Sequence, residues 1–158
     1  MDSLMALFSD FDIAAFLPKM DTLVGWIELA LRLAVMAGPL LLLGFGLLFL
    51  LAPPKEANHA LGFRCWWGMA SLEAWQYTQR MAGLIWGSLG ALLTVIMALI
   101  CNAFRRMPPP KMVDSAVACL IWVLALTVAS CLAINILVIV RFDKNGFRRV
   151  KKAKEEEG

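Results

Sequence analysis

Three long apolar runs separated by polar segments dominate the chain. They cover Leu33–Ala52, Met81–Phe104 and Ala116–Val140, and the first contains no ionisable residue. A run of about 20 apolar residues is long enough to cross about 30 Å of hydrocarbon as an α-helix. The pattern therefore predicts an all-α, polytopic membrane protein with three transmembrane helices over residues 33–140.

The amino-terminal segment, residues 1–32, has a different pattern. Apolar residues from Leu4 to Leu17 are interrupted by Ser9, Asp10 and Asp12, and Pro18 ends the pattern. This stretch is too short to span a bilayer, so we expect an interfacial amphipathic helix. A hydrophobic tail without fixed structure is the alternative. Acidic residues stand where a signal peptide would carry basic ones, so a cleaved leader is not expected.

Small residues recur every four positions in the second and third runs. The second run contains Gly83, Gly87 and Ala91, and the third contains Ala125, Ala129 and Ala133. Such seams let two membrane helices approach closely. We expect the second and third spans to form an antiparallel pair joined by a short turn, with lipid-facing small residues as the alternative.

Two features of the first run bear on its shape. Glu28 and Arg32, just upstream, are four residues apart and can pair on one helical face. Pro39 follows Gly38 inside the run and removes a backbone donor, which predicts a kink. Pro53 and Pro54 end the span.

Composition agrees with the membrane assignment. Hydrophobic residues make up 61% of the chain and its mean hydropathy is +0.73, well above soluble proteins. The charged tail, residues 141–158, is expected to be solvated or to lie on anionic lipid, with a turn at Asn145-Gly146. Nothing in this distribution of charge indicates a nucleic-acid partner.

Basic residues also suggest an orientation. Three spans place the first loop and the tail on one side, with ten basic residues against about five on the other. The positive-inside rule then places loop 53–80 and the tail in the cytoplasm of a cell with the amino terminus outside. The Arg105-Arg106 pair argues the other way.

Catalytic and metal-binding patterns are weak. The four cysteines have no CxxC spacing, and the single His59 has no companion at ligand spacing. We therefore expect no enzyme activity, no metal and no cofactor. A transporter is the less favoured reading, because only Gly38-Pro39 and Asn135 resemble the broken helices and midplane polar groups of transporters.

The first loop is the most informative segment. Ser71 can cap a helix that carries Glu73 in its first turn. Trp75, Gln79, Ala82 and Trp86 then share one helical face, so this helix is expected to continue into the second span. Tryptophans at the headgroup level of any membrane protein offer a simpler explanation of the loop.

The order of these residues resembles the SdpI family of small bacterial membrane proteins, in which N…G-(Y/F)-R-T…S-x-x-x-W…N…G links two spans. The resemblance covers about residues 40–105, with Cys65 and Gln79 departing from the usual Thr and Asn. The positions that carry it are Asn58, Gly62, Phe63, Arg64, Ser71, Glu73, Trp75, Gln79 and Gly83.

The resemblance implies a role in immunity to an antibacterial peptide toxin. It also implies a peptide or membrane-protein partner within the lipid bilayer and a cytoplasmic regulator at loop 53–80. We expect Arg64, as a buried residue, and Asn58 to bond the loop to the ends of the spans. The alternative function is an accessory subunit of a larger membrane complex.

Overall fold

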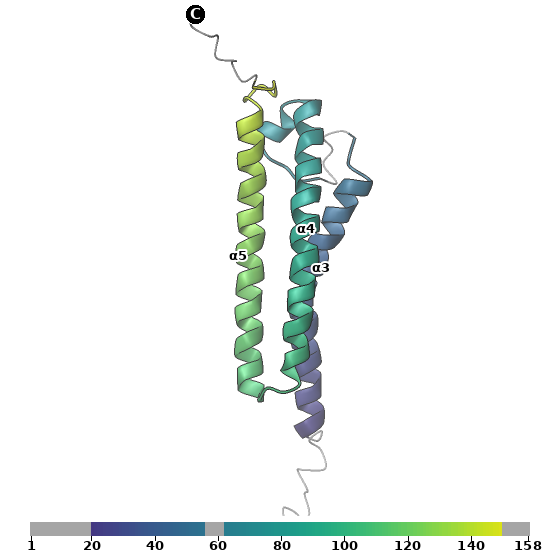
Figure 1. The fold of residues 1–158 in the computed structure, drawn as a ribbon, viewed down its shortest axis with the longest axis vertical. Helices are drawn as coiled ribbons and strands as arrows, with labels where there is room; N and C mark the ends of the chain where they lie inside the picture. Colours follow the sequence, from purple (N-terminus) through teal and green to yellow (C-terminus); the bar gives the residue numbers. More distant parts are fainter. Residues whose placement is uncertain (1–19, 56–61, 150–158) are drawn as a thin grey trace, which may run out of the picture.

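A computed structural model describes residues 20–55 and 62–149 and shows a bundle of three long helices (Figure 1). The predicted helix at residues 4–17 lies outside the described residues, as do Asn58 and His59. The elements are α3 (Met20–Leu51), the short 3₁₀ helix η1 (Trp67–Met69), α4 (Leu72–Phe104) and α5 (Pro109–Arg141). The all-helical class with three possible membrane spans is confirmed.

Each helix is longer than the apolar run that predicted it. The first begins at Met20 rather than Leu33, the second at Leu72 rather than Met81, and the third at Pro109 rather than Ala116. A helix of 33 residues, such as α4, is about 50 Å long, whereas the hydrocarbon core is about 30 Å thick. The helices therefore extend beyond the hydrocarbon, and structure can be built on their ends.

Helices α3 and α4 pack most closely. A Cβ added at Gly46 would overlap the backbone of Gly87, and one added at Gly90 would overlap Leu43. Gly83 of α4 also faces α3, at Leu50. The glycine seam of α4 thus contacts α3, and its third member is Gly90, since Ala91 is exposed. The prediction that this seam packs on the third span was wrong.

Helix α5 is antiparallel to α4 and follows it after a short turn, as predicted (Figure 1). Its buried side includes Val123, whose Cγ1 would lie 2.7 Å from a Cβ at Gly38 of α3. The expected alanine seam does not take part in this packing. Ala125, Ala129 and Ala133 are all exposed on α5, because the buried positions of this helix fall on another face.

The predicted features of the first span are partly confirmed. Arg32 and Glu28 form an ion pair one helical turn apart. Helix α3 runs through buried Pro39 without interruption, and the kink expected there stays a prediction.

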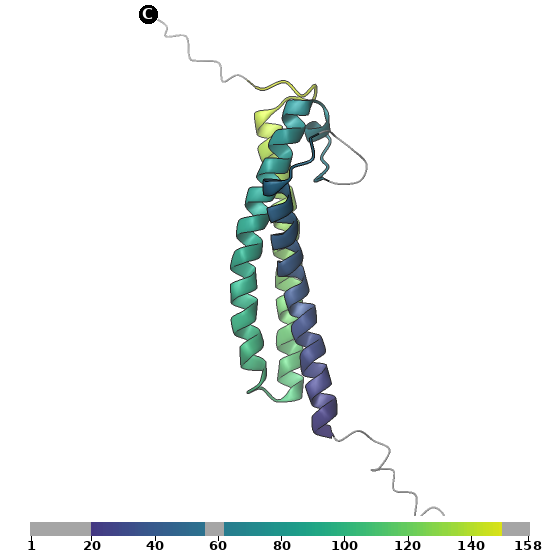
Figure 2. The ribbon, with the colours of Figure 1, turned by 90° about the vertical axis from the view of Figure 1, so that its right-hand side faces the viewer.

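The first loop and the start of the tail lie at one end of the bundle, opposite the α4–α5 turn, in both views (Figures 1 and 2). An odd number of spans requires this arrangement. It brings residues 62–71 next to residues 142–149, although 70 or more positions separate them in the sequence. Chemistry carried by the loop must therefore be considered together with the tail.

Candidate functional site

At the end of the bundle that carries the first loop, Ser71 caps the N-terminus of α4. Ser71 has an extended backbone (φ −149°, ψ 160°), and its Oγ accepts a hydrogen bond from the backbone N–H of Ala74 at 3.1 Å. Glu73 lies in the first turn, where its charge is favourable against the helix dipole. The predicted helix start is confirmed, and it fixes where α4 projects its next buried side chains.

Gln79 holds the loop against α4. Its Oε1 accepts from the backbone N–H of Phe63 at 2.8 Å, and its Nε2 donates to the Phe63 carbonyl at 2.8 Å. Gln79 is fully buried, with 0% of its surface exposed. The side-chain amide thus satisfies the backbone N–H and C=O of Phe63, as a neighbouring β-strand would. Its own buried oxygen and nitrogen each gain a hydrogen-bond partner in the same pair of bonds.

Trp75 fixes the beginning of the loop, at Pro54. Its Nε1 donates to the carbonyl of Pro54 at 2.9 Å, and only 1% of its surface is exposed. Gly62, at φ +131°, packs on its ring, and a Cβ there would lie 2.6 Å from Trp75 Cη2. Glycine is needed here because it adopts a positive φ readily and because the Trp75 ring leaves no space for a Cβ. The interfacial explanation fits exposed Trp66 but not Trp75.

The first loop, held in this way by Trp75 and Gln79, forms a cap on the bundle. Phe63 connects this cap to the helices. Its ring meets Trp86 edge-on at 5.4 Å between centroids, and Phe49 of α3 lies 5.9 Å from the same indole. Trp86 Nε1 donates to Ser130 Oγ of α5 at 3.1 Å. The loop is thereby connected through one tryptophan to all three helices.

The 3₁₀ helix η1 covers a small buried cluster. Gly68 packs so tightly that a Cβ would lie 2.5 Å from Thr78 Oγ1 and 2.7 Å from Cys65 Sγ. Burial raises the pKa of the Cys65 thiol, although hydrogen bonding by Gly68 and Thr78 acts in the opposite direction. The thiol therefore stays protonated at neutral pH, which identifies Cys65 as a packing residue and not a reactive nucleophile.

The start of the tail folds onto this cap. Phe142 and Arg148 form an antiparallel bridge across a turn in which the N–H of Gly146 donates to the carbonyl of Asp143 at 3.0 Å. Ser71 Oγ donates to the carbonyl of Gly146 at 2.8 Å. The turn at Asn145-Gly146 is confirmed; most of residues 142–149 are exposed, as expected of a solvated tail, but Phe142 and Gly146 are buried against the loop.

Charged and aromatic contacts add to the tail's docking. Arg148 Nε lies 2.5 Å from Glu73 Oε1, and Phe142 packs on Tyr77 at 5.4 Å between centroids. The guanidinium of Arg141 lies over the Tyr77 ring, 5.6 Å from its centroid. Both partners of the ion pair are more than half exposed, so its contribution to stability is small. Sequence reasoning missed Tyr77 and Phe142.

The residues of the family-like motif lie in different parts of the structure. Gly62, Phe63, Ser71, Trp75 and Gln79 come together in the cap. Arg64 is exposed, so its expected burial was wrong. Gly83 and Gly87 belong to the α3–α4 contact. Within residues 20–55 and 62–149, no three His, Cys, Asp or Glu side chains gather as a metal site would require.

A family model for the SdpI/YfhL protein family matches residues 55–140, which is more than half of the chain and spans the loop, α4 and nearly all of α5. No curated protein and no solved structure matches the chain. The segment that the family model covers contains the cap residues described above, including Gln79 in place of the expected asparagine. The chain belongs to the SdpI/YfhL protein family.

Proposed function

We propose that this membrane protein binds an antibacterial peptide and protects the cell that carries it. Membership of the SdpI/YfhL family supports the proposal. The structural observation behind it is that Gln79 and Trp75, both buried, fix the first loop by hydrogen bonds to backbone groups. A connection that merely joined two spans would not need such a fixed cap.

The cap determines what a peptide would meet. Through Phe63 and Trp86 it ties α3, α4 and α5 together at one end, so the helix faces within the bilayer keep one arrangement. A binding surface that is already ordered spends less free energy on association. An amphipathic peptide that has entered the bilayer would bind this helix surface, and the cap would preserve its shape.

We propose that the cap and the tail lie in the cytoplasm of a bacterial cell, because ten basic residues lie on that side against about five on the other. There the exposed Trp66 and Phe147, 80% and 72% accessible, could meet a cytoplasmic regulator. In intact cells, a membrane-impermeant maleimide should not label a Lys152→Cys variant whose native cysteines are replaced. Labelling before permeabilisation would reverse the orientation.

Protection is tested by deleting the gene and exposing the cells to peptides secreted by sibling and neighbouring strains. We expect at least one peptide to inhibit the deletion strain at a roughly tenfold lower concentration, and the wild-type gene to restore resistance. Unchanged sensitivity to every peptide would contradict the proposal. The tenfold change corresponds to about 1.4 kcal/mol of binding.

Variants then separate binding from folding. Arg64→Ala alters an exposed motif residue, and Gln79→Met alters the buried bond to the loop. Each is compared at equal membrane abundance, measured independently of resistance. Loss of resistance in Arg64→Ala at normal abundance would assign the loop a direct role.

A second candidate is an accessory subunit of a membrane complex. The exposed row of Ala125, Ala129 and Ala133 favours it, because small residues allow another helix to approach α5 closely. Extraction in mild detergent distinguishes the two functions. Recovery of this chain alone, from cells in which deletion changes peptide sensitivity, supports the first.

A further inference from the structure

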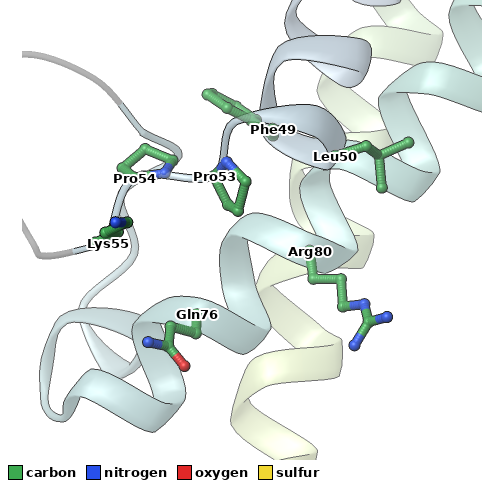
Figure 3. Close-up of a pocket in the computed structure, with 7 residues that line it drawn as sticks. All are labelled: Phe49, Leu50, Pro53, Pro54, Lys55, Gln76 and Arg80. Atoms are coloured by element: carbon green, nitrogen blue, oxygen red, sulfur yellow. The ribbon is translucent and has the colours of Figure 1, made fainter.

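A pocket of about 370 Å³ lies where α3 ends and α4 begins (Figure 3). One side consists of apolar groups from the end of α3 and the following turn, namely Phe49, Leu50, Pro53 and Pro54. Polar and charged groups complete the lining: Gln76 and Arg80, one turn apart on α4, and Lys55, which follows Pro54 in the loop. The pocket therefore joins an apolar wall to a polar and cationic rim.

The rim carries two cations and, among the described residues that line it, no anion. None of the seven lining residues is acidic, and neither Lys55 nor Arg80 has an ion pair within the part of the chain that the structure describes. Both side chains are exposed. Figure 3 shows them on opposite sides of Pro53. A ligand with one anionic group could thus approach either cation or lie between them.

The depth of the pocket indicates what can reach it. Leu51 ends a helix whose preceding residues are apolar, and Pro53 begins the polar loop. This change marks the boundary between hydrocarbon and headgroups on the loop side of the bilayer. At that depth the abundant molecules with an anionic group directly above an apolar chain are acidic phospholipids.

We propose that this pocket binds an anionic phospholipid such as phosphatidylglycerol. The phosphate would lie against Arg80 and Lys55, whose guanidinium and ammonium groups both bind phosphate. The Gln76 amide would donate to a headgroup oxygen, and the first methylenes of an acyl chain would cover Leu50 and Pro53. Each recognition element matches one part of the lipid.

The lipid would also bear on the cap. Pro54 lines the pocket, and its carbonyl accepts the hydrogen bond from Trp75 Nε1. A lipid that packs on Pro53 and Pro54 therefore favours the loop position in which this bond is made. Binding that occurs only in the folded state stabilises that state by mass action.

The test uses the full chain, purified in a neutral detergent and titrated with short-chain phosphatidylglycerol or phosphatidylcholine. Bound lipid is counted by native mass spectrometry. We expect phosphatidylglycerol to bind more tightly. A basic residue near anionic lipid contributes about 1 kcal/mol, so Arg80→Gln and Lys55→Gln should each weaken binding about fivefold. The double variant should weaken it about 25-fold if the two effects add.

Lys144→Gln is the matched control, because Lys144 is an exposed cation at the same end of the bundle but outside this pocket. It should change the affinity less than twofold. An equal loss in Lys144→Gln would show diffuse attraction and overturn the proposal, as would equal binding of the two lipids. Competition by glycerol phosphate as effective as that by the lipid would identify a site for free anions instead, and would also overturn it.

Discussion

Replacing Gln79 by methionine should lower the free energy of unfolding by about 2–6 kcal/mol. Methionine has a similar length but makes neither hydrogen bond, so the N–H and C=O of Phe63 lose their partners. Leaving a buried polar group unsatisfied costs about 1–3 kcal/mol, and two groups are affected here. The measurement is reversible unfolding in mixed detergent micelles, followed by tryptophan fluorescence.

Gln76→Met is the control for this substitution. Gln76 is one helical turn earlier on α4, but it is exposed and makes no hydrogen bond to the described part of the loop. The same chemical change should therefore alter stability by less than about 0.5 kcal/mol. Hydrogen exchange provides a local measurement: residues 62–70 should exchange faster in Gln79→Met only. Equal exchange in the two variants would show that Gln79 does not hold the loop.

The spans were predictable because hydrophobicity and length are properties of single segments. Apolar runs located α3, α4 and α5 correctly, but the runs ended before the helices did. Helix α4 begins nine residues before the predicted span, since the polar residues Gln76, Gln79 and Arg80 in its first turns interrupt the apolar run. The capping Ser71 marked the true beginning. Local capping chemistry was thus more informative about the helix end than hydropathy.

The choice of partners could not be predicted in the same way. Four-residue spacing identified Gly83 and Gly87 as contact positions without specifying the helix they contact. The actual seam follows a four-then-three spacing to Gly90, as expected when helices cross at a small angle. A matching glycine, Gly46, was present in the first span. Comparing the two spans for facing glycines would have identified the α3–α4 pair.

The cap was only half predictable for a similar reason. Ser71 was identified as a helix cap, and Trp75 and Gln79 were identified because they share one face of a single helix. Their partners come from distant segments: Pro54 and Phe63 precede the helix, and Gly146 lies 75 residues beyond Ser71. A charged sequence such as the tail appears solvated until the fold provides a surface for Phe142. Its docking follows from tertiary structure alone.

The close contact between α3 and α4 predicts a second large effect on stability. Gly46→Ala should destabilise the protein by about 3 kcal/mol, at the upper end of what overpacking costs. The added methyl group would overlap the backbone nitrogen and Cα of Gly87, which cannot rotate away as a side chain could. Relief requires the two helices to separate, and separation also removes the contacts that Gly83 and Gly90 make with α3.

Gly44→Ala is a stringent control for this effect, because Gly44 is two residues away on the same helix and a Cβ there meets nothing within 4 Å. Alanine should leave stability unchanged there or raise it by about 0.5–1 kcal/mol, since glycine is unfavourable inside a helix. The same mutation should therefore have opposite signs at positions 44 and 46 in one unfolding assay. Equal effects at both positions would contradict close packing of α3 on α4. Because Phe49 and Trp86 connect this interface to Phe63, faster hydrogen exchange in residues 62–70 of the Gly46→Ala variant would show that the helix pair positions the cap.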